Sequence, residues 1–510
     1  MNTVHQSFDS PFSRIHDVPA YWAKRSPEAI ALLDDNLELT YSALQEHIDG
    51  VRTLLTEHGV LPAHRVMLVG ENSLALVTFL FAVAAIGACP VVVNARLSPG
   101  EIEGIREHCD PQVIAFLPAG LNAAVEHART HNARSWDLPE LGCLHFWRSP
   151  QGASRDEGMD EIAAMIYTSG TTGAPKGVML SHSNLIFSAS TMARYRGLTE
   201  YDRSYAALPM SHTMGLTSVM LSTLIAGGSV LVVPRFEVAH LVDALESFSV
   251  TLFQGVQAMY TGLLGFLKTE GRSGLKHRLR YLYAGGSPLD PTLKASVEDI
   301  FGLPLNNGYG MTETSPTICH TRLEDRRKDA SVGPAIPGIS IRIVDHAGRD
   351  VAQGESGELW VKGPNVMQGY FRNAAASSEV LQDGWLKSGD LASVDLDGNV
   401  HLVGRLKDVI IRSGFNVYPL EVETALNMHP SVARSAVVGR NVTLNEEVVA
   451  FVELRKNMQA TARELLEWLK PRLSPYKRPA EIVFLPSLPL LTSGKIRKAE
   501  LKERAAGMAS

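Results

Sequence analysis

An uncharged apolar stretch that runs directly into a beta-branched segment limits what this chain can fold into. Residues 73–88 carry no charge, and Gly87 and Pro90 end the stretch after about sixteen residues, fewer than the roughly 20 that a membrane span needs. Three valines, residues 91–93, follow at once. A buried helix leading into a buried strand is therefore expected, an order typical of parallel sheets covered by helices.

The same alternation of strand-like and helical patterns continues over the first 400 residues. Strands are predicted in segments 65–69, 113–116, 228–233 and 250–254. Helices are predicted in segments 40–54, 99–108, 216–224 and 238–248. The pattern predicts an α/β fold whose large N-terminal domain contains two parallel-type α/β sheet subdomains.

The 510 residues are too many for one core, so several structural units are expected. Residues 1–403 form the predicted large domain, and short alternating strands with glycine turns indicate a beta-rich subdomain at about 330–403. Residues 404–408 are the predicted hinge. Residues 409–510 are predicted to be a small mobile α+β domain.

Composition excludes several functional classes. The net charge is −6 without a long basic run, so nucleic acid is not expected as a partner. The four cysteines are scattered, which implies neither a disulfide framework nor a zinc site and fits a reducing compartment. No signal peptide or membrane span is visible, so the expected location is cytoplasmic.

The segment 167–177, Tyr-Thr-Ser-Gly-Thr-Thr-Gly-Ala-Pro-Lys-Gly, carries the strongest functional signal. Glycines let the backbone turn tightly and present N–H groups to an anion, while hydroxyls and Lys176 add donors and charge. Gly177 follows the lysine where a Walker A loop has Ser or Thr. We interpret the segment as a phosphate loop that joins two strands.

A second signal lies in residues 306–314, Asn-Asn-Gly-Tyr-Gly-Met-Thr-Glu-Thr. Tyr309 between two glycines can expose its ring for stacking on a base. Thr312 can donate to a phosphate, and Glu313 is a hard oxygen ligand that suits Mg²⁺.

The loop closely resembles the phosphate loop of the adenylate-forming superfamily, which includes acyl-CoA synthetases, aryl-CoA ligases, peptide-synthetase adenylation domains and beetle luciferases. The segments that resemble the family's other motifs follow in order at 208–216, 284–288, 306–314, 388–390, 404–419 and 489–498. Residues 206–223 contain no Asp to hold a substrate amine, and Met311 stands where amino-acid adenylation domains usually have Pro. Both features favour the acyl- or aryl-CoA ligase branch.

The resemblance implies roles for individual residues. The expected ATP- and AMP-binding residues are Thr168, Ser169, Gly170, Thr171, Thr172, Lys176, Gly285, Gly286, Ser287, Tyr309, Gly310, Met311, Thr312, Asp390 and Arg405. The expected acyl pocket contains His212, Gly215, Gly255, Ala284, Gly308 and Thr317. Hinge and CoA-binding roles are expected for Lys407, Ser413 and Gly414. The expected catalytic residues are Lys495, His212, Thr168 and Glu313, with Glu313 also the metal ligand.

The C-terminal lysine motif departs from the family pattern. The family's Pro-x-Thr-x-x-Gly-Lys becomes Pro-Leu-Leu-Thr-Ser-Gly-Lys, which shifts the threonine by one position. The resemblance therefore extends to Gly494 and Lys495 and not to the threonine. Lys495 is expected to neutralise charge on the carboxylate and the α-phosphate during adenylation.

The resemblance implies an ATP-dependent carboxylic acid:CoA ligase that uses ATP, Mg²⁺ and coenzyme A and forms an acyl-AMP intermediate. The glycines of the expected pocket suggest space for a medium-chain fatty acid or an aryl, hydroxycinnamate-like monocarboxylic acid. Its segments carry no Arg or Lys, which disfavours a second carboxylate. Two alternatives stay open: a stand-alone adenylation enzyme that loads a carrier protein, and a non-catalytic nucleotide-binding protein. The sequence does not determine the oligomeric state, and a homodimer is one alternative.

Overall fold

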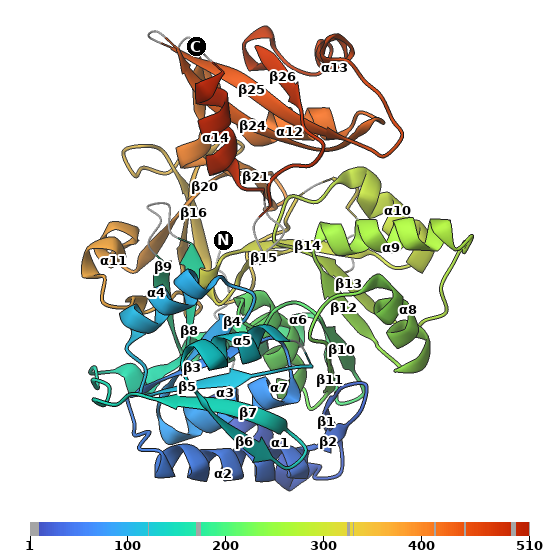
Figure 1. Cartoon of the computed structure of the whole chain (residues 1–510). Coiled ribbons are helices and arrows are strands. Elements are labelled where there is room, and N and C mark those ends of the chain that lie inside the picture. The colour runs from blue at the N-terminus through green and yellow to red at the C-terminus, as the bar shows by residue number, and fades with distance from the viewer. Residues whose placement is uncertain are drawn as a thin grey trace.

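The computed structural model describes residues 10–120, 122–169, 175–323, 327–329, 331–412, 415–442, 445–490 and 496–508. It contains two large mixed sheets, a smaller antiparallel sheet and a C-terminal α+β unit (Figure 1). Across these residues, no helix combines the length and the apolar character that crossing a membrane requires.

The first large sheet has eight strands in the order β18-β9-β8-β4-β3-β5-β7-β6. Its four central strands, β8, β4, β3 and β5, are parallel, and antiparallel strands extend it on both sides. The strands are β3 (Arg65–Gly70), β4 (Cys89–Asn94), β5 (Val113–Leu117), β6 (Arg134–Leu138), β7 (Gly142–Arg148), β8 (Ile162–Ser169), β9 (Pro175–Ser181) and β18 (Gly369–Tyr370).

The second large sheet also has eight strands, in the order β15-β14-β13-β12-β10-β11-β1-β2. The six inner strands, β14, β13, β12, β10, β11 and β1, are parallel. The two edge strands, β15 and β2, are antiparallel to their neighbours. The strands are β1 (Ile30–Leu33), β2 (Glu38–Thr40), β10 (Arg203–Ala206), β11 (Ser229–Val232), β12 (Leu252–Gly255), β13 (Tyr281–Ala284), β14 (Leu305–Gly310) and β15 (Thr317–His320).

Helices cover both sheets, and one helix layer is shared between them. One apolar core joins strands of the two sheets through α2, α3, α6 and the π-helix η2, and separate cores form beneath α4 and α5 and beneath α8, α9 and α10. The helices are α1 (Asp17–Arg25), α2 (Tyr41–Glu57), α3 (Leu74–Ile86), α4 (Pro99–Cys109), α5 (Asn122–Thr130), α6 (His182–Tyr195), α7 (Ser222–Ile225), α8 (Val238–Ser247), α9 (Gln257–Thr269) and α10 (Pro291–Phe301).

The apolar stretch at residues 73–88 is the buried helix α3, as expected. Ser73 caps it by accepting from the backbone N–H of Leu76, and Gly87 ends it in the left-handed region at φ 76°. Eleven consecutive residues of α3, from Leu74 to Ala84, are buried, since both faces of the helix lie inside the molecule.

The helix expected at residues 216–224 differs in the structure. It is a π-helix, η2 (Met214–Leu221), followed by the short helix α7. The carbonyl oxygen of Ser218 accepts from the side chains of Arg196, Gln254 and Ser222, at 2.7, 3.0 and 2.7 Å. We attribute the wider helical turn to these side-chain donors at the helical carbonyl.

The beta-rich sheet is antiparallel and lies between the large sheets and the C-terminal end (Figure 1). Its strands are β16 (Ser340–Val344), β17 (Gly357–Lys362), β19 (Leu381–Gln382), β20 (Trp385–Val394) and β21 (Val400–Arg405), and α11 (Ala374–Val380) precedes β19. The last strand therefore continues into the segment that was expected to begin the hinge.

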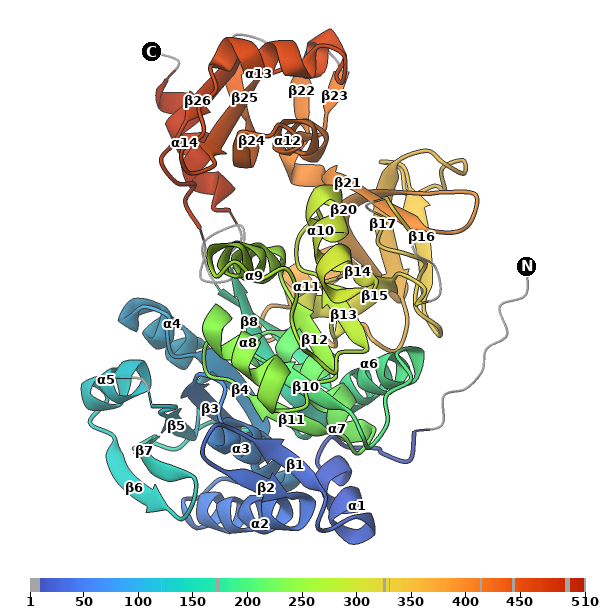
Figure 2. The ribbon, with the colours of Figure 1, turned by 90° about the vertical axis from the view of Figure 1, so that its right-hand side faces the viewer.

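The C-terminal unit follows β21 and lies at one end of the molecule in both views (Figures 1 and 2). A three-stranded sheet with apolar clusters on both faces forms its core. Its elements are β22 (Ile410–Arg412), β23 (Phe415–Val417), α12 (Pro419–Asn427), β24 (Val432–Val442), β25 (Asn445–Leu454), α13 (Ala462–Leu469), β26 (Glu481–Phe484) and α14 (Lys498–Gly507). Short 3₁₀ turns are η1 (Met159–Glu161), η3 (Thr312–Thr314), η4 (Leu406–Asp408) and η5 (Pro475–Lys477).

Candidate active site

The phosphate loop joins the antiparallel strands β8 and β9. Thr168 pairs with Lys176 and Tyr167 pairs with Gly177, so the first hydroxyl and the lysine of the loop lie opposite each other at its base. Gly170, Thr171 and Thr172 lie outside the described residues, and only the backbone of Ser169 is described. The two-strand setting predicted for the loop is present.

Tyr370 connects the loop lysine with the expected metal ligand. The Lys176 ammonium lies 4.8 Å from the centre of the Tyr370 ring, a cation–π distance. The Tyr370 hydroxyl donates to Oε1 of Glu313 at 3.0 Å. Burial raises the pKa of Tyr370, so its hydroxyl remains a donor. One side chain therefore brings together two charged residues that lie far apart in the sequence.

Glu313 is well suited to share a magnesium ion with a nucleotide. It lies in the 3₁₀ turn η3, and its carbonyl accepts from the N–H of Met367 at 2.9 Å. In the described part of the chain, no cluster of three acidic, histidine or cysteine side chains forms a metal cage. Mg²⁺ bound to ATP typically takes one or two protein carboxylates together with phosphate oxygens and waters, so the single carboxylate fits.

A second polar chain lies at the end of β14. The Tyr309 hydroxyl donates to Oδ2 of Asp390 at 2.5 Å, and Nε of Arg405 lies 3.2 Å from Oδ1 of the same carboxylate. Asp390 and Arg405 face each other on the paired strands β20 and β21. The residues expected to contact adenine, ribose and phosphate thus form one connected group.

His212 lies in an exposed position on the loop before η2, not in the core. Asn72, which is 2% exposed, holds this loop: its amide donates to the carbonyls of Ala206 and Leu208, both at 2.9 Å, and its oxygen accepts from the N–H of Met210 at 2.8 Å. Nothing in the local sequence marks Asn72 for this role, because its partners lie more than 130 residues away.

Three glycines of the expected acyl pocket lie close to neighbouring segments in the direction that a side chain would take. A Cβ on Gly215 would lie 2.3 Å from the carbonyl oxygen of Pro209, and a Cβ on Gly308 would lie 2.7 Å from that of Cys319. A Cβ on Gly255 would lie 3.2 Å from the Phe253 ring. These glycines permit close packing of neighbouring segments. Thr317, also expected in the pocket, is buried on β15.

The turn after β13 is open to solvent. Gly286 and Ser287 are exposed, and Gly286 has φ 81°, a backbone conformation that favours glycine. Gln257 orders the turn, since its amide nitrogen donates to Ser287 Oγ at 3.0 Å and its oxygen accepts from the N–H of Asp290 at 2.8 Å. Ala284 and Gly285, just before the turn, are buried.

The remaining predicted residues belong to the expected hinge and to the C-terminal unit. Lys407 is exposed in η4, next to Asp408, which pairs with Lys502 of α14 at 3.0 Å. Ser413, Gly414 and Lys495 lie outside the described residues. The ends of the lysine segment are held together, because Leu490 and Ile496 form an antiparallel bridge.

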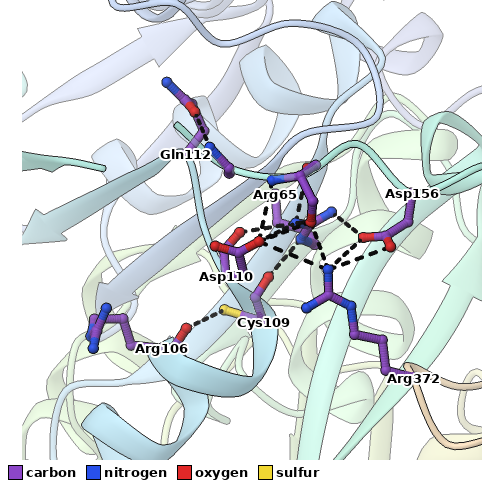
Figure 3. A network of polar contacts seen from close by, with 9 residues as sticks. Arg65, Arg106, Cys109, Asp110, Gln112, Asp156 and Arg372 are labelled. Carbon is purple, nitrogen blue, oxygen red and sulfur yellow. Dashed lines mark hydrogen bonds and ion pairs between the residues drawn. The ribbon is translucent and has the colours of Figure 1, made fainter. Parts of the chain in front are cut away.

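An ionic network around the buried Arg65 braces the segment that carries Tyr370 (Figure 3). The side chain of Arg65 is 0% exposed, and it donates to Asp156 at 2.6 Å and to the carbonyl of Cys109 at 2.6 Å. Its second amino group lies 3.3 Å from the Asp110 carboxylate. Arg372 reaches the same Asp156 carboxylate at 3.1 Å.

Phe371 connects this network to the phosphate loop. Its ring lies 5.4 Å from the Arg65 guanidinium and 4.9 Å from that of Arg372, and its N–H donates to the carbonyl of Gly177 at 2.8 Å. His108 packs edge-on against this ring and hydrogen-bonds the hydroxyl of Tyr167 at 2.7 Å. The network therefore fastens the Tyr370 segment to the base of the loop.

Comparison with known proteins decides the family. Residues 20–371 match the model of the AMP-binding enzyme family, and residues 421–495 match that of the AMP-binding enzyme C-terminal domain. The chain belongs to the AMP-binding enzyme family. The resemblance described from the sequence motifs is confirmed.

Curated relatives match over nearly their whole lengths. A feruloyl-CoA synthase of Amycolatopsis is 36% identical over 95% of this chain and 98% of its own, and an indoleacetate–CoA ligase of Aromatoleum aromaticum is 33% identical over 94% and 96%. The o-succinylbenzoate CoA synthetase of Bacillus subtilis, solved with its acyl-adenylate intermediate, has a TM-score of 0.82 at 31% identity, over 95% of this chain and 97% of its own. The predicted fold and the class of AMP-forming acid–CoA ligase are confirmed.

Proposed function

We propose that this AMP-forming acid:CoA ligase acts on an aromatic monocarboxylic acid. In the first half-reaction a carboxylate oxygen attacks the α-phosphorus of ATP, and pyrophosphate leaves. In the second, the CoA thiol gives up its proton, its sulfur attacks the acyl carbon, and AMP leaves. The products are acyl-CoA, AMP and pyrophosphate.

The observation that carries the proposal is the convergence of Lys176 and Glu313 on Tyr370. Lys176 supplies positive charge at the base of the phosphate loop, and Glu313 supplies a carboxylate for a nucleotide-bound cation. A bound Mg²⁺ would neutralise phosphate charge. The Tyr370 ring lies between Lys176 and Glu313. The two groups can therefore contact a polyphosphate at two different points, as binding of ATP requires.

The nucleoside is assigned to the group formed by Tyr309, Asp390 and Arg405. Asp390 has accepting capacity beyond its two present contacts, because a carboxylate offers about four lone-pair sites. Ribose hydroxyls would take that capacity, and the Tyr309 ring would lie against adenine. Arg405 lies two residues before Lys407, so nucleotide binding and the proposed hinge share one short segment.

The two half-reactions need different surroundings for one acyl group. Lys495 is proposed to stabilise charge during adenylation and then to leave when the C-terminal unit turns about Lys407. A hinged unit is a physically reasonable way to serve two transition states in succession. The loop containing Ser413 and Gly414 is proposed to contact CoA after this movement.

The aromatic substrate class is supported by the relatives. Feruloyl-CoA synthase, indoleacetate–CoA ligase and 2-succinylbenzoate–CoA ligase are named for acids that contain an aromatic ring. A cytoplasmic location belongs to this proposal and is supported by the four free cysteines.

The test is pyrophosphate release with ATP, Mg²⁺ and a panel of acids, with and without CoA. The panel contains acetate, octanoate, palmitate, benzoate, cinnamate, para-hydroxycinnamate, malonate and phenylalanine. CoA-dependent turnover with the aromatic acids alone supports the proposal. Turnover with octanoate or palmitate instead would contradict the substrate class. Release that stops at one equivalent even with CoA would indicate a carrier protein as acceptor.

A further inference from the structure

Arg196 places a positive charge inside the protein behind the expected acyl pocket. The residue is 2% exposed, and its two amino groups donate to the carbonyl and the Oγ of Ser218, both at 2.7 Å. Its Nε has no hydrogen-bond partner, and it forms no ion pair with the carboxylates of the described residues. A buried charge without a counter-ion is costly, so neighbouring groups must compensate for it.

Two tyrosine rings of β13 provide part of that compensation. The Arg196 guanidinium lies 5.3 Å from the centre of the Tyr281 ring and 5.8 Å from that of Tyr283. Both distances are within cation–π range. His320 stacks on both rings, at 6.2 and 5.2 Å. These four side chains form a wall of aromatic rings with a cation on one side.

The Tyr281 hydroxyl donates its hydrogen bond to His320, another member of this wall. Nδ1 of His320 lies 2.6 Å from the carbonyl oxygen of Thr321 and must be the donor there. Nε2 of the neutral ring is therefore the acceptor, and Tyr281 donates to it at 2.7 Å. Burial lowers the pKa of His320 to about 3, in agreement with a neutral ring.

The Tyr283 hydroxyl is different, since it has no hydrogen-bond partner in the described part of the chain. It points toward the carboxyl ends of β13 and β14: a Cβ on Gly285 would lie 2.9 Å from this oxygen, and a Cβ on Gly308 would lie 2.7 Å from it. Gly308 belongs to the expected acyl pocket, and Gly285 to the turn expected beside it. A hydroxyl without a protein partner at this place is available to donate to an acceptor from outside the protein.

We propose that the Tyr283 hydroxyl forms the polar end of the acyl pocket and donates a hydrogen bond to an oxygen on the aromatic ring of the substrate acid. This inference rests on the proposed function. The acceptor is a neutral ring oxygen, a hydroxyl or methoxy group, because Arg196 is shielded by the rings and bound to Ser218. Its charge, behind the ring of Tyr283, makes the hydroxyl a stronger donor.

The test compares the wild-type enzyme with Tyr283→Phe in pyrophosphate release. The acids are cinnamate, para-hydroxycinnamate, meta-hydroxycinnamate, para-methoxycinnamate and, as a poor acceptor of similar size, para-fluorocinnamate. The wild type is expected to prefer at least one oxygenated acid. Tyr283→Phe is expected to lower kcat/KM for that acid by roughly tenfold and to leave cinnamate within about twofold.

Tyr281→Phe is the matched control, since it removes a hydroxyl from the same face of the same strand. It is expected to lower the thermal stability without changing the ratio between oxygenated and plain cinnamate. Two results would overturn this inference and leave the proposed function standing. The first is equal kcat/KM of the wild type for oxygenated and plain cinnamate, and the second is an unchanged ratio of these two values in Tyr283→Phe. Absence of pyrophosphate with every acid would overturn the proposed function and this inference with it.

Discussion

The hydroxyl of Tyr370 donates a hydrogen bond to Oε1 of Glu313 over 3.0 Å. Lys176 covers the ring of the same tyrosine at 4.8 Å. A lysine of the phosphate loop and the expected metal ligand are thus held together through one aromatic side chain.

Removal of the Tyr370 hydroxyl is expected to weaken the use of magnesium. In Tyr370→Phe, Glu313 loses a donor that fixes its orientation while the ring over Lys176 remains. We predict roughly a tenfold lower kcat/KM for ATP and a higher Mg²⁺ concentration at half-maximal rate. Tyr201→Phe is the control, because Tyr201 is 85% exposed. An unchanged magnesium dependence in Tyr370→Phe would contradict the role given to this contact.

Loss of Asp156 is expected to destabilise the fold. Asp156→Asn removes a charge that pairs with the fully buried Arg65 and with Arg372. We predict a loss of about 2–4 kcal/mol in the free energy of unfolding by urea. Asp350→Asn is the matched control, since Asp350 is 65% exposed and pairs with Arg342. That variant should change the free energy by less than about 1 kcal/mol. Equal effects of the two substitutions would argue against the network as a brace.

A substitution of Arg372 tests whether the same network also affects activity. Arg372→Met keeps an unbranched side chain and removes the second cation near Asp156. Because Phe371 and Tyr370 precede it, the activity is expected to fall by roughly threefold or more at a temperature where the variant is still folded. Circular dichroism at the assay temperature separates the two effects. Full activity in a folded variant would show that the brace does not reach the site.

Stability is expected to fall in mild acid. Burial lowers the pKa of His182 and of His320 to about 3, from the ordinary value of 6.5. The unfolded chain therefore takes up protons below about pH 6.5, and the folded chain does so only near pH 3. Each histidine stabilises the fold above pH 6.5, and this contribution is lost as the pH falls.

At pH 5.5 each of the two histidines is expected to reduce the free energy of unfolding by about 1.4 kcal/mol relative to pH 7.5. Urea unfolding at the two pH values measures the change. His182→Asn retains an acceptor for the N–H of Ile15, which now donates to His182 Nδ1 at 3.2 Å. This variant should show a smaller pH dependence. Stability that rises on acidification would contradict the assignment of neutral buried rings.

Lys495→Ala separates the two half-reactions. Adenylation is expected to fall by at least a hundredfold, because a positive charge at the forming bond is lost. Thioester formation from supplied acyl-AMP should be largely retained. Lys498→Ala is a neighbouring control, since Lys498 pairs with Glu423 at 2.6 Å. Equal loss of both steps in Lys495→Ala would contradict the two-conformation mechanism.

Local sequence patterns were sufficient for the alternating α/β elements and for the motif residues. The apolar stretch at 73–88, the two strands flanking the phosphate loop and the group formed by Tyr309 and Asp390 could be predicted, because each follows from a local pattern or a family motif. The antiparallel strands β6 and β7 were not predicted, and neither was the π-helix, whose geometry depends on side chains from other elements.

The supporting residues of the site could not be predicted for the same reason. Tyr370, Asn72 and Arg65 act through partners that lie far away in the sequence, and nothing in their local sequence marks them. The close approach of backbone and aromatic atoms to the glycines near the expected pocket also depends on distant segments. Arg196 lies at the end of α6, outside every motif, and its position behind Tyr283 became visible only in the structure.

The central claim is that one site makes an aromatic acyl-adenylate and passes it to CoA. The most direct measurement incubates the enzyme with ATP, Mg²⁺ and para-hydroxycinnamate without CoA, and follows the bound products by mass spectrometry before and after CoA is added. We predict one equivalent of acyl-AMP per enzyme, which converts to acyl-CoA and AMP when CoA is present. The account would be contradicted if the enzyme formed an adenylate with octanoate but no acyl-AMP with para-hydroxycinnamate or cinnamate.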